Sequence, residues 1–89
     1  MTPDERIRRA DRAVALLADP LFAEAEAHIE AECWRLFREL APTDVDGLAQ
    51  VKGMQYTHQK YLAFLRSAVT DGKMAKAAID EKRPRPAGY

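Results

Sequence analysis

Residues 19–44 read DPLFAEAEAHIEAECWRLFRELAPTD, and this stretch decides the fold. Asp19-Pro20 is a helix start signal, because an aspartate caps the first free amides and proline suits the first helical position. Ala41-Pro42-Thr43 ends the pattern, since proline cannot continue a helix. Between these signals apolar residues recur at the three- and four-residue steps of an amphipathic helix: Phe22, Ala25, Ile29, Cys33, Leu36 and Leu40. The stretch predicts one helix over residues 20–40.

A first helix is predicted over residues 3–18. Thr2-Pro3-Asp4-Glu5 matches a capping box in which Thr2 caps the helix and Pro3 takes its first position. If this helix continued through Asp19-Pro20, its stripe would bring Glu24 to a core position, so we predict a break there. The apolar stripe of this helix consists of Ile7, Ala10, Val14 and Leu17.

A third helix is predicted from Thr43 to about residue 70. Thr43 caps it, and Asp44 and Asp46 place negative charge in its first turn, where the helix dipole favours it. Asp71-Gly72 indicates its end, because glycine takes the left-handed conformation found just past helix ends. The short connection implies an antiparallel hairpin. The third helix would be roughly 40 Å long against roughly 31 Å for the second, so we expect the first helix to pack against the overhang.

Two apolar stripes fit the third helix, and both place His58 on the seam. Polar side chains on such a seam, here Gln55 and His58, need partners or water when buried, and in helical assemblies they can fix register and the number of chains. The alternative is that they mark a weakly packed or exposed part of the helix. The first stripe is Leu48, Val51, Gln55, His58, Leu62, Leu65 and Val69, and the second is Val51, Met54, His58, Tyr61, Leu65 and Ala68.

The predicted fold is all-α, with a single helical domain over residues 1–82. It is a long antiparallel helical hairpin with a shorter N-terminal helix. Residues 83–89, rich in proline and arginine, are expected to form a disordered basic C-terminal tail. This tail either contacts phosphates or a groove on a partner, or it is a solubilising end. Its candidate contact residues are Lys82, Arg83, Arg85 and Tyr89.

Composition narrows the class of protein. Fourteen basic and fourteen acidic side chains give a formal net charge of zero, so the excess of Lys and Arg typical of nucleic-acid binders is missing. The single cysteine, Cys33, cannot form an intrachain disulfide and fits a reducing compartment. No apolar run reaches membrane-span length, and the N-terminus is charged from Asp4 onward, unlike a secretory signal. We expect a cytoplasmic protein without a membrane partner.

No pattern in the chain indicates an enzyme or a cofactor. His28 shares a helix face with Glu24 and Glu32, but paired helical metal sites use a Glu-x-x-His spacing that is missing here. Residues 44–47 resemble part of a calcium loop, yet acidic ligands are missing from both ends of that loop. Cys33 has no histidine at catalytic spacing and belongs to an apolar stripe. We expect a protein with neither catalytic nor metal-binding residues.

Aromatic residues are the candidate contact sites. Trp34 and Phe37 widen the apolar sector of the second helix beyond what one antiparallel neighbour covers, which favours self-association. Aromatic side chains are also favoured at the centres of protein interfaces, although many at helical spacing belong to cores. The candidate interface residues are Trp34, Phe37, Tyr56, His58 and Tyr61. The expected partners are other copies of the chain and another protein.

The sequence also carries a resemblance. Residues 9–25, RADRAVALLADPLFAEA, together with a later long helix and Asp71-Gly72-Lys73-Met74-Ala75, resemble small helical proteins encoded among the structural genes of tailed bacteriophages and prophages. The resemblance implies a non-enzymatic role in the virion or its assembly. The alternative is a small DNA-binding factor of the small-terminase type. The glutamates on its would-be recognition helix, residues 20–40, argue against that alternative.

Overall fold

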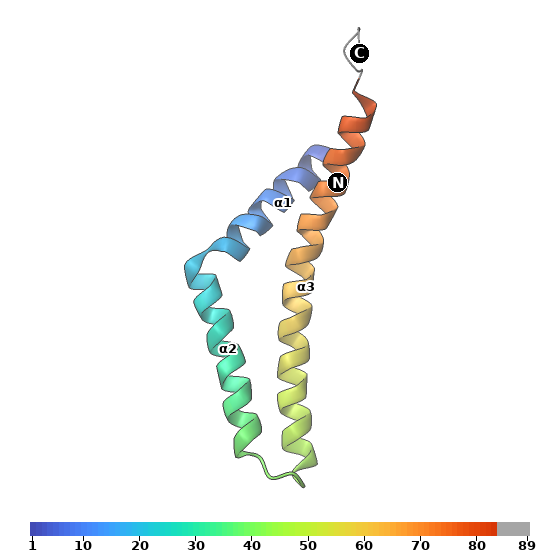
Figure 1. Ribbon diagram of the computed structural model, residues 1–89. Helices are drawn as coiled ribbons and strands as arrows, with labels where there is room; N and C mark the ends of the chain where they lie inside the picture. Colours follow the sequence, from blue (N-terminus) through green and yellow to red (C-terminus); the bar gives the residue numbers. More distant parts are fainter. Residues whose placement is uncertain (84–89) are drawn as a thin grey trace.

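The computed structural model describes residues 1–83, which form three helices and no strand: α1 (Pro3–Ala18), α2 (Pro20–Glu39) and α3 (Val45–Lys82). α2 and α3 run antiparallel and are joined by a short loop, while α1 lies alongside the far half of α3 (Figure 1). The predicted all-α fold, a helical hairpin with a shorter N-terminal helix, is confirmed. The predicted tail contacts Arg85 and Tyr89 lie outside the described residues.

Polar caps begin all three helices. Thr2 Oγ1 accepts a hydrogen bond from the Glu5 amide at 3.1 Å, and Asp19 Oδ1 accepts one from the Leu21 amide at 2.8 Å. These two helix starts are confirmed. The third was predicted one residue too early, because Asp44 rather than Thr43 caps α3 and accepts from the Gly47 amide at 2.9 Å. Because the Asp44 carboxylate reaches the Gly47 amide directly, Asp44 is the cap and the helix begins at Val45.

The predicted end of the third helix was wrong, because α3 continues through Asp71-Gly72 to Lys82. Gly72 is helical and buried, and it lies directly against Ala10 and Arg6 of α1. A Cβ at this position would overlap the Cβ of Ala10 and come within 3.2 Å of the Arg6 carbonyl oxygen. The glycine therefore makes room for a neighbouring helix and does not end its own.

The contact between α1 and α3 is made by small side chains. Ala10 and Ala13 of α1 are buried against the part of α3 that contains Ala68, Gly72 and Ala75. The predicted stripe of α1 needs one correction, because Val14 is half exposed and Ala13 takes the inward position. Alanine and glycine allow two helix backbones to approach closely, so α1 packs against α3 with its alanine face and leaves Val14 outside the contact.

The α2–α3 hairpin has a thinner core. Cys33 is only 2% exposed and Val51 is buried, while the other inward positions are partly exposed. On α3 the first of the two predicted stripes faces inward, since each of its members, Gln55 and His58 included, is buried or half-buried. Met54 and Tyr61 of the second stripe are exposed. Among residues 1–83, no buried side chain is larger than valine.

The molecule is a rod of 71 × 25 × 25 Å, because α3 spans nearly its whole length. α1 and α2 follow one another along α3, as Figure 1 shows, so that most of α3 has one neighbour at a time. Within residues 1–83, no helix has both the length and the apolar character needed to cross a membrane. The rod therefore presents long helix faces on which side chains stay accessible.

Candidate interaction surfaces

An open groove of about 880 Å³ lies along one side of the hairpin, which we call the α2–α3 groove. The rings of Phe22 and Tyr61 stack across it with their centroids 6.3 Å apart and thus join the two helices. Met54 is 42% exposed and Tyr61 more than half exposed, so the groove presents apolar surface to solvent. Its principal lining residues are Phe22, Ala25 and Ile29 from α2 and Met54, His58 and Tyr61 from α3.

Two ionisable side chains, Glu26 and His58, also line this groove. Oε1 of Glu26 is buried and has no hydrogen-bond partner among residues 1–83. His58 is half-buried and reaches both sides of the hairpin, since it also borders the opposite pocket with Gln55. Both seam residues are therefore half-buried, a state between the two alternatives that the sequence left open. A buried carboxylate oxygen without a partner is costly unless water or another chain donates to it.

A second apolar surface on α2, the Trp34–Phe37 patch, is separate from the groove. The indole of Trp34 meets the ring of Phe37 edge to face, with centroids 5.8 Å apart and the rings at 89°. These side chains are 56% and 48% exposed. Trp34 and Phe37 do not line the groove, and Trp34 borders another pocket together with Gln55 and Leu62 of α3. The groove and the patch are therefore distinct surfaces.

Acidic side chains beside the patch are held by Arg35. Its guanidinium contacts the Glu32 carboxylate and donates to Glu39 Oε1 at 2.9 Å. The hydrogen bond from Arg35 lowers the pKa of Glu32, and the two carboxylates raise the pKa of Arg35. Glu32, weighed earlier with Glu24 and His28 as a metal ligand, is thus engaged by an arginine. No group of three or more His, Cys, Asp or Glu side chains in residues 1–83 is placed to hold a metal ion.

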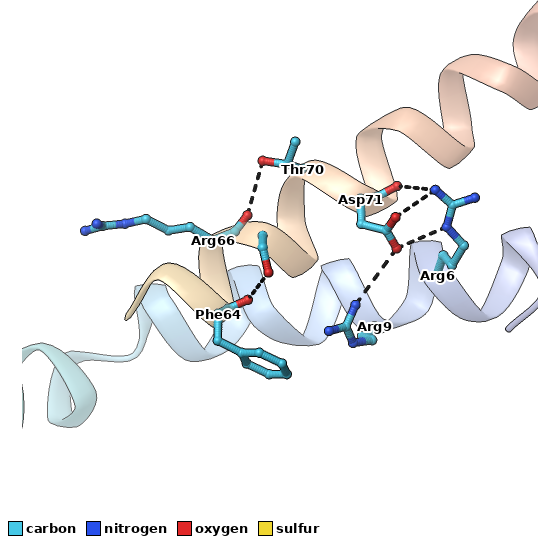
Figure 2. Close-up of polar contacts among 7 residues, drawn as sticks. Arg6, Arg9, Phe64, Arg66, Thr70 and Asp71 are labelled. Carbon is cyan, nitrogen blue, oxygen red and sulfur yellow. Dashed lines mark hydrogen bonds and ion pairs between the residues drawn. The ribbon is translucent and has the colours of Figure 1, made fainter. Parts of the chain in front are cut away.

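An ion pair ties α1 to α3 (Figure 2). Arg6 donates from Nη2 to Oδ1 of Asp71 at 2.7 Å and from Nε to Oδ2 at 3.0 Å, while Nη1 of Arg9 lies 3.9 Å from Oδ2. The hydrogen bonds from Arg6 lower the pKa of Asp71 and raise that of Arg6. Arg9 also lies over the Phe64 ring, 5.3 Å from its centroid. One aspartate of α3 thus engages two arginines of α1.

The structure does not gather the five predicted interface residues into one site. Trp34 and Phe37 form the patch, whereas His58 and Tyr61 line the groove. Tyr56 is 58% exposed on a third face, where the Lys60 ammonium lies 5.2 Å from its ring centroid. Of the tail residues within the described range, Lys82 and Arg83 are exposed at the end of α3.

Met54 and Phe64 are among the exposed apolar residues that sequence reasoning missed. Met54 belonged to the second predicted stripe of α3, so its position beside Tyr61 could have been found there. Phe64 follows Tyr61 by three residues, which places both on one helix face. These residues extend the exposed apolar surface of α3 from the groove toward α1, where Phe64 borders a pocket with Leu16.

Comparison of the chain with models of protein families, with curated proteins and with solved structures found no match. The resemblance to phage-encoded proteins, carried by residues 9–25 and 71–75, therefore remains an expectation from the sequence. Any functional inference depends on the molecule's own surfaces, which are the α2–α3 groove and the Trp34–Phe37 patch.

Proposed function

We propose that the protein is a non-enzymatic interaction or assembly protein that binds other protein chains, its own copies included, through its helix faces. The observation that carries the proposal is the distribution of side chains by size. Buried positions in residues 1–83 hold nothing larger than valine, while Trp34, Tyr61 and Phe64 are more than half exposed. Fully burying one large apolar side chain is worth about 1.5–3 kcal/mol, which this fold leaves available for binding.

The presence of two separate apolar surfaces supports an assembly role. A chain with a single binding face forms one contact, whereas a rod that carries both the groove and the Trp34–Phe37 patch can join two neighbours. The proposed setting is the assembly of a tailed-phage particle in the host cytoplasm. That setting is supported by the sequence resemblance alone.

Electrostatics favour a protein partner over DNA. Asp71 engages Arg6 and Arg9, so that fewer free guanidinium groups remain near the N-terminus for phosphates. The net charge of zero supplies no general attraction to a polyanion. The alternative function is a small DNA-binding factor of the small-terminase type, and specific binding to duplex DNA would favour it over this proposal.

Affinity purification of the tagged chain from its native source tests the proposal, with protein and nucleic acid both analysed in the eluate. We expect a second protein to co-purify in a fixed ratio and to be lost with the double variant Trp34→Ala/Phe37→Ala. The matched control is Val45→Ala/Met74→Ala, which removes two exposed apolar side chains outside the patch and the groove and should retain the partner.

Two results would overturn the proposal. Recovery of nucleic acid as the specific companion, with no partner protein, would favour the DNA-binding alternative. Equal loss of the partner with both double variants would mean that the captured protein adheres to any exposed apolar side chain and is not bound by the patch.

A further inference from the structure

The protein exposes far more surface than a compact chain of its size. Its accessible area is 7336 Å² for 10.0 kDa, against about 5,200 Å² expected for a compact monomer, an excess of about 2,100 Å². If residues 84–89 are counted as fully exposed chain, the excess over the remainder is still about 1,400 Å². A standard protein interface buries about 800 Å² on each partner. The excess therefore suffices for a stable contact with another chain.

The α2–α3 groove has a more apolar lining and fewer charged side chains than the four other pockets compared with it along the rod. It runs between two helices and is lined by four residues of α2 and five of α3, and apart from the Tyr61 phenol its only ionisable groups are those of Glu26 and His58. Other exposed apolar side chains, such as Val45, Tyr56 and Met74, do not line it. Isolated apolar side chains on a surface are ordinary, whereas a continuous apolar surface indicates an interface.

We infer that the α2–α3 groove is the contact surface between two copies of this chain, which pack groove to groove as a four-helix dimer. A two-fold interface uses the same surface on both chains, so that surface must complement itself. The groove meets this requirement with apolar side chains contributed by both helices. Glu26 and His58, an acidic and a basic side chain, also line it. A two-fold axis through the groove can place Glu26 of one copy opposite His58 of the other.

Met54 and Tyr56 provide a matched pair of positions for the test. Both are exposed apolar residues of α3. They are two positions apart, so their side chains differ by about 200° in direction around the helix. Met54 lines the groove and Tyr56 does not. Sedimentation equilibrium of the full chain should give a dimer at tens of micromolar, and the melting temperature should rise with concentration. Met54→Lys should weaken the dimer by at least about tenfold, because it places a charge in the interface, whereas Tyr56→Lys should change it less than about threefold.

Thiol labelling gives a second readout that does not depend on a destabilising variant. In a Cys33→Ala background, Met54→Cys should be labelled more slowly as the protein concentration rises, whereas labelling of Tyr56→Cys should be independent of concentration. Circular dichroism of each variant checks that helix content is retained. Met54→Cys labelling that does not change with concentration would overturn the inference even if Met54→Lys failed to fold.

This inference rests on the proposed function, and its failure can be told apart from failure of that function. A wild-type chain that is monomeric at every concentration, or a dimer that Tyr56→Lys weakens as much as Met54→Lys, would overturn the groove-to-groove dimer. If such a chain still captures a partner through the Trp34–Phe37 patch, the proposed function stands. If that partner is retained by Met54→Lys, the groove does not serve the partner either.

Discussion

Gly72 and Gly53 lie in the same helix, and the same substitution should have opposite effects at the two positions. Replacing a glycine inside a helix by alanine stabilises it by about 0.8–1 kcal/mol, because alanine loses less conformational freedom on folding. At Gly53 nothing lies within 4 Å of an added Cβ, so the full gain is expected. At Gly72 the added Cβ would overlap Ala10 and press on the Arg6 carbonyl oxygen.

The magnitude follows from the cost of inserting a methyl group into a tight contact. Overpacking of this kind costs about 1–3 kcal/mol. Because both variants share the gain in helix propensity, the difference between them isolates the steric cost. One kcal/mol corresponds to about 4–8 °C in a domain of this size, so Gly72→Ala should melt at least about 4 °C below Gly53→Ala. Gly53→Ala itself should melt above the wild type.

Thermal unfolding followed by circular dichroism measures these shifts, at a concentration low enough to keep the chain monomeric. The double variant Gly72→Ala/Ala10→Gly tests the contact directly. Because Ala10→Gly removes the methyl group that the new Cβ would overlap, Gly72→Ala should lower the melting temperature less in the Ala10→Gly background than in the wild type. If Gly72→Ala were as stable as Gly53→Ala, α1 would not pack against α3 at Gly72, and the described docking of α1 would be refuted.

Three further predictions concern charge, the thiol and DNA. Asp71→Asn should lower the melting temperature at neutral pH. The folded state lowers the pKa of Asp71, so the ionised carboxylate stabilises the fold at any pH above the ordinary pKa of an aspartate. In a pH series of unfolding curves, the difference from wild type should therefore shrink as the pH falls below about 4. Cys33→Ser should destabilise the chain more than Cys33→Ala, by about 1 kcal/mol or more in denaturant titrations, since a hydroxyl would be buried at a position that is 2% exposed. In gel-shift titrations at physiological salt, duplex DNA should bind no more tightly than about 10⁻⁴–10⁻⁶ M, and sub-micromolar sequence-dependent binding would contradict this.

The starts of α1 and α2 could be predicted from the sequence because their causes are local. Thr2 and Asp19 cap amides two or three residues away, and proline follows each of them directly. The end of α3 could not be predicted in this way. Asp71-Gly72 carries a local stop signal, but its surroundings are set by Arg6 and Ala10, and Arg6 precedes Asp71 by 65 residues. A signal at that separation is not visible in helical periodicity.

The interaction surfaces were predicted in part for a related reason. Trp34 and Phe37 exceed the apolar width that one neighbour covers, so their exposure could be expected from the sequence. The two stripes of α3 share Val51, His58 and Leu65, and the period alone could not decide which stripe faces α2. The groove depends on that choice, because it leaves Met54 outside the hairpin core.

The close contact of α1 with the distal part of α3 has a consequence for synthesis on the ribosome. The 65 residues from Ile7 to Asp71 take about 3–13 s to translate at 5–20 residues per second. Throughout that interval the alanine face of α1 has no surface to dock on, whereas α2 can already fold. A nascent chain that stops before residue 72 carries an undocked first helix, which leaves the truncated product open to proteolysis.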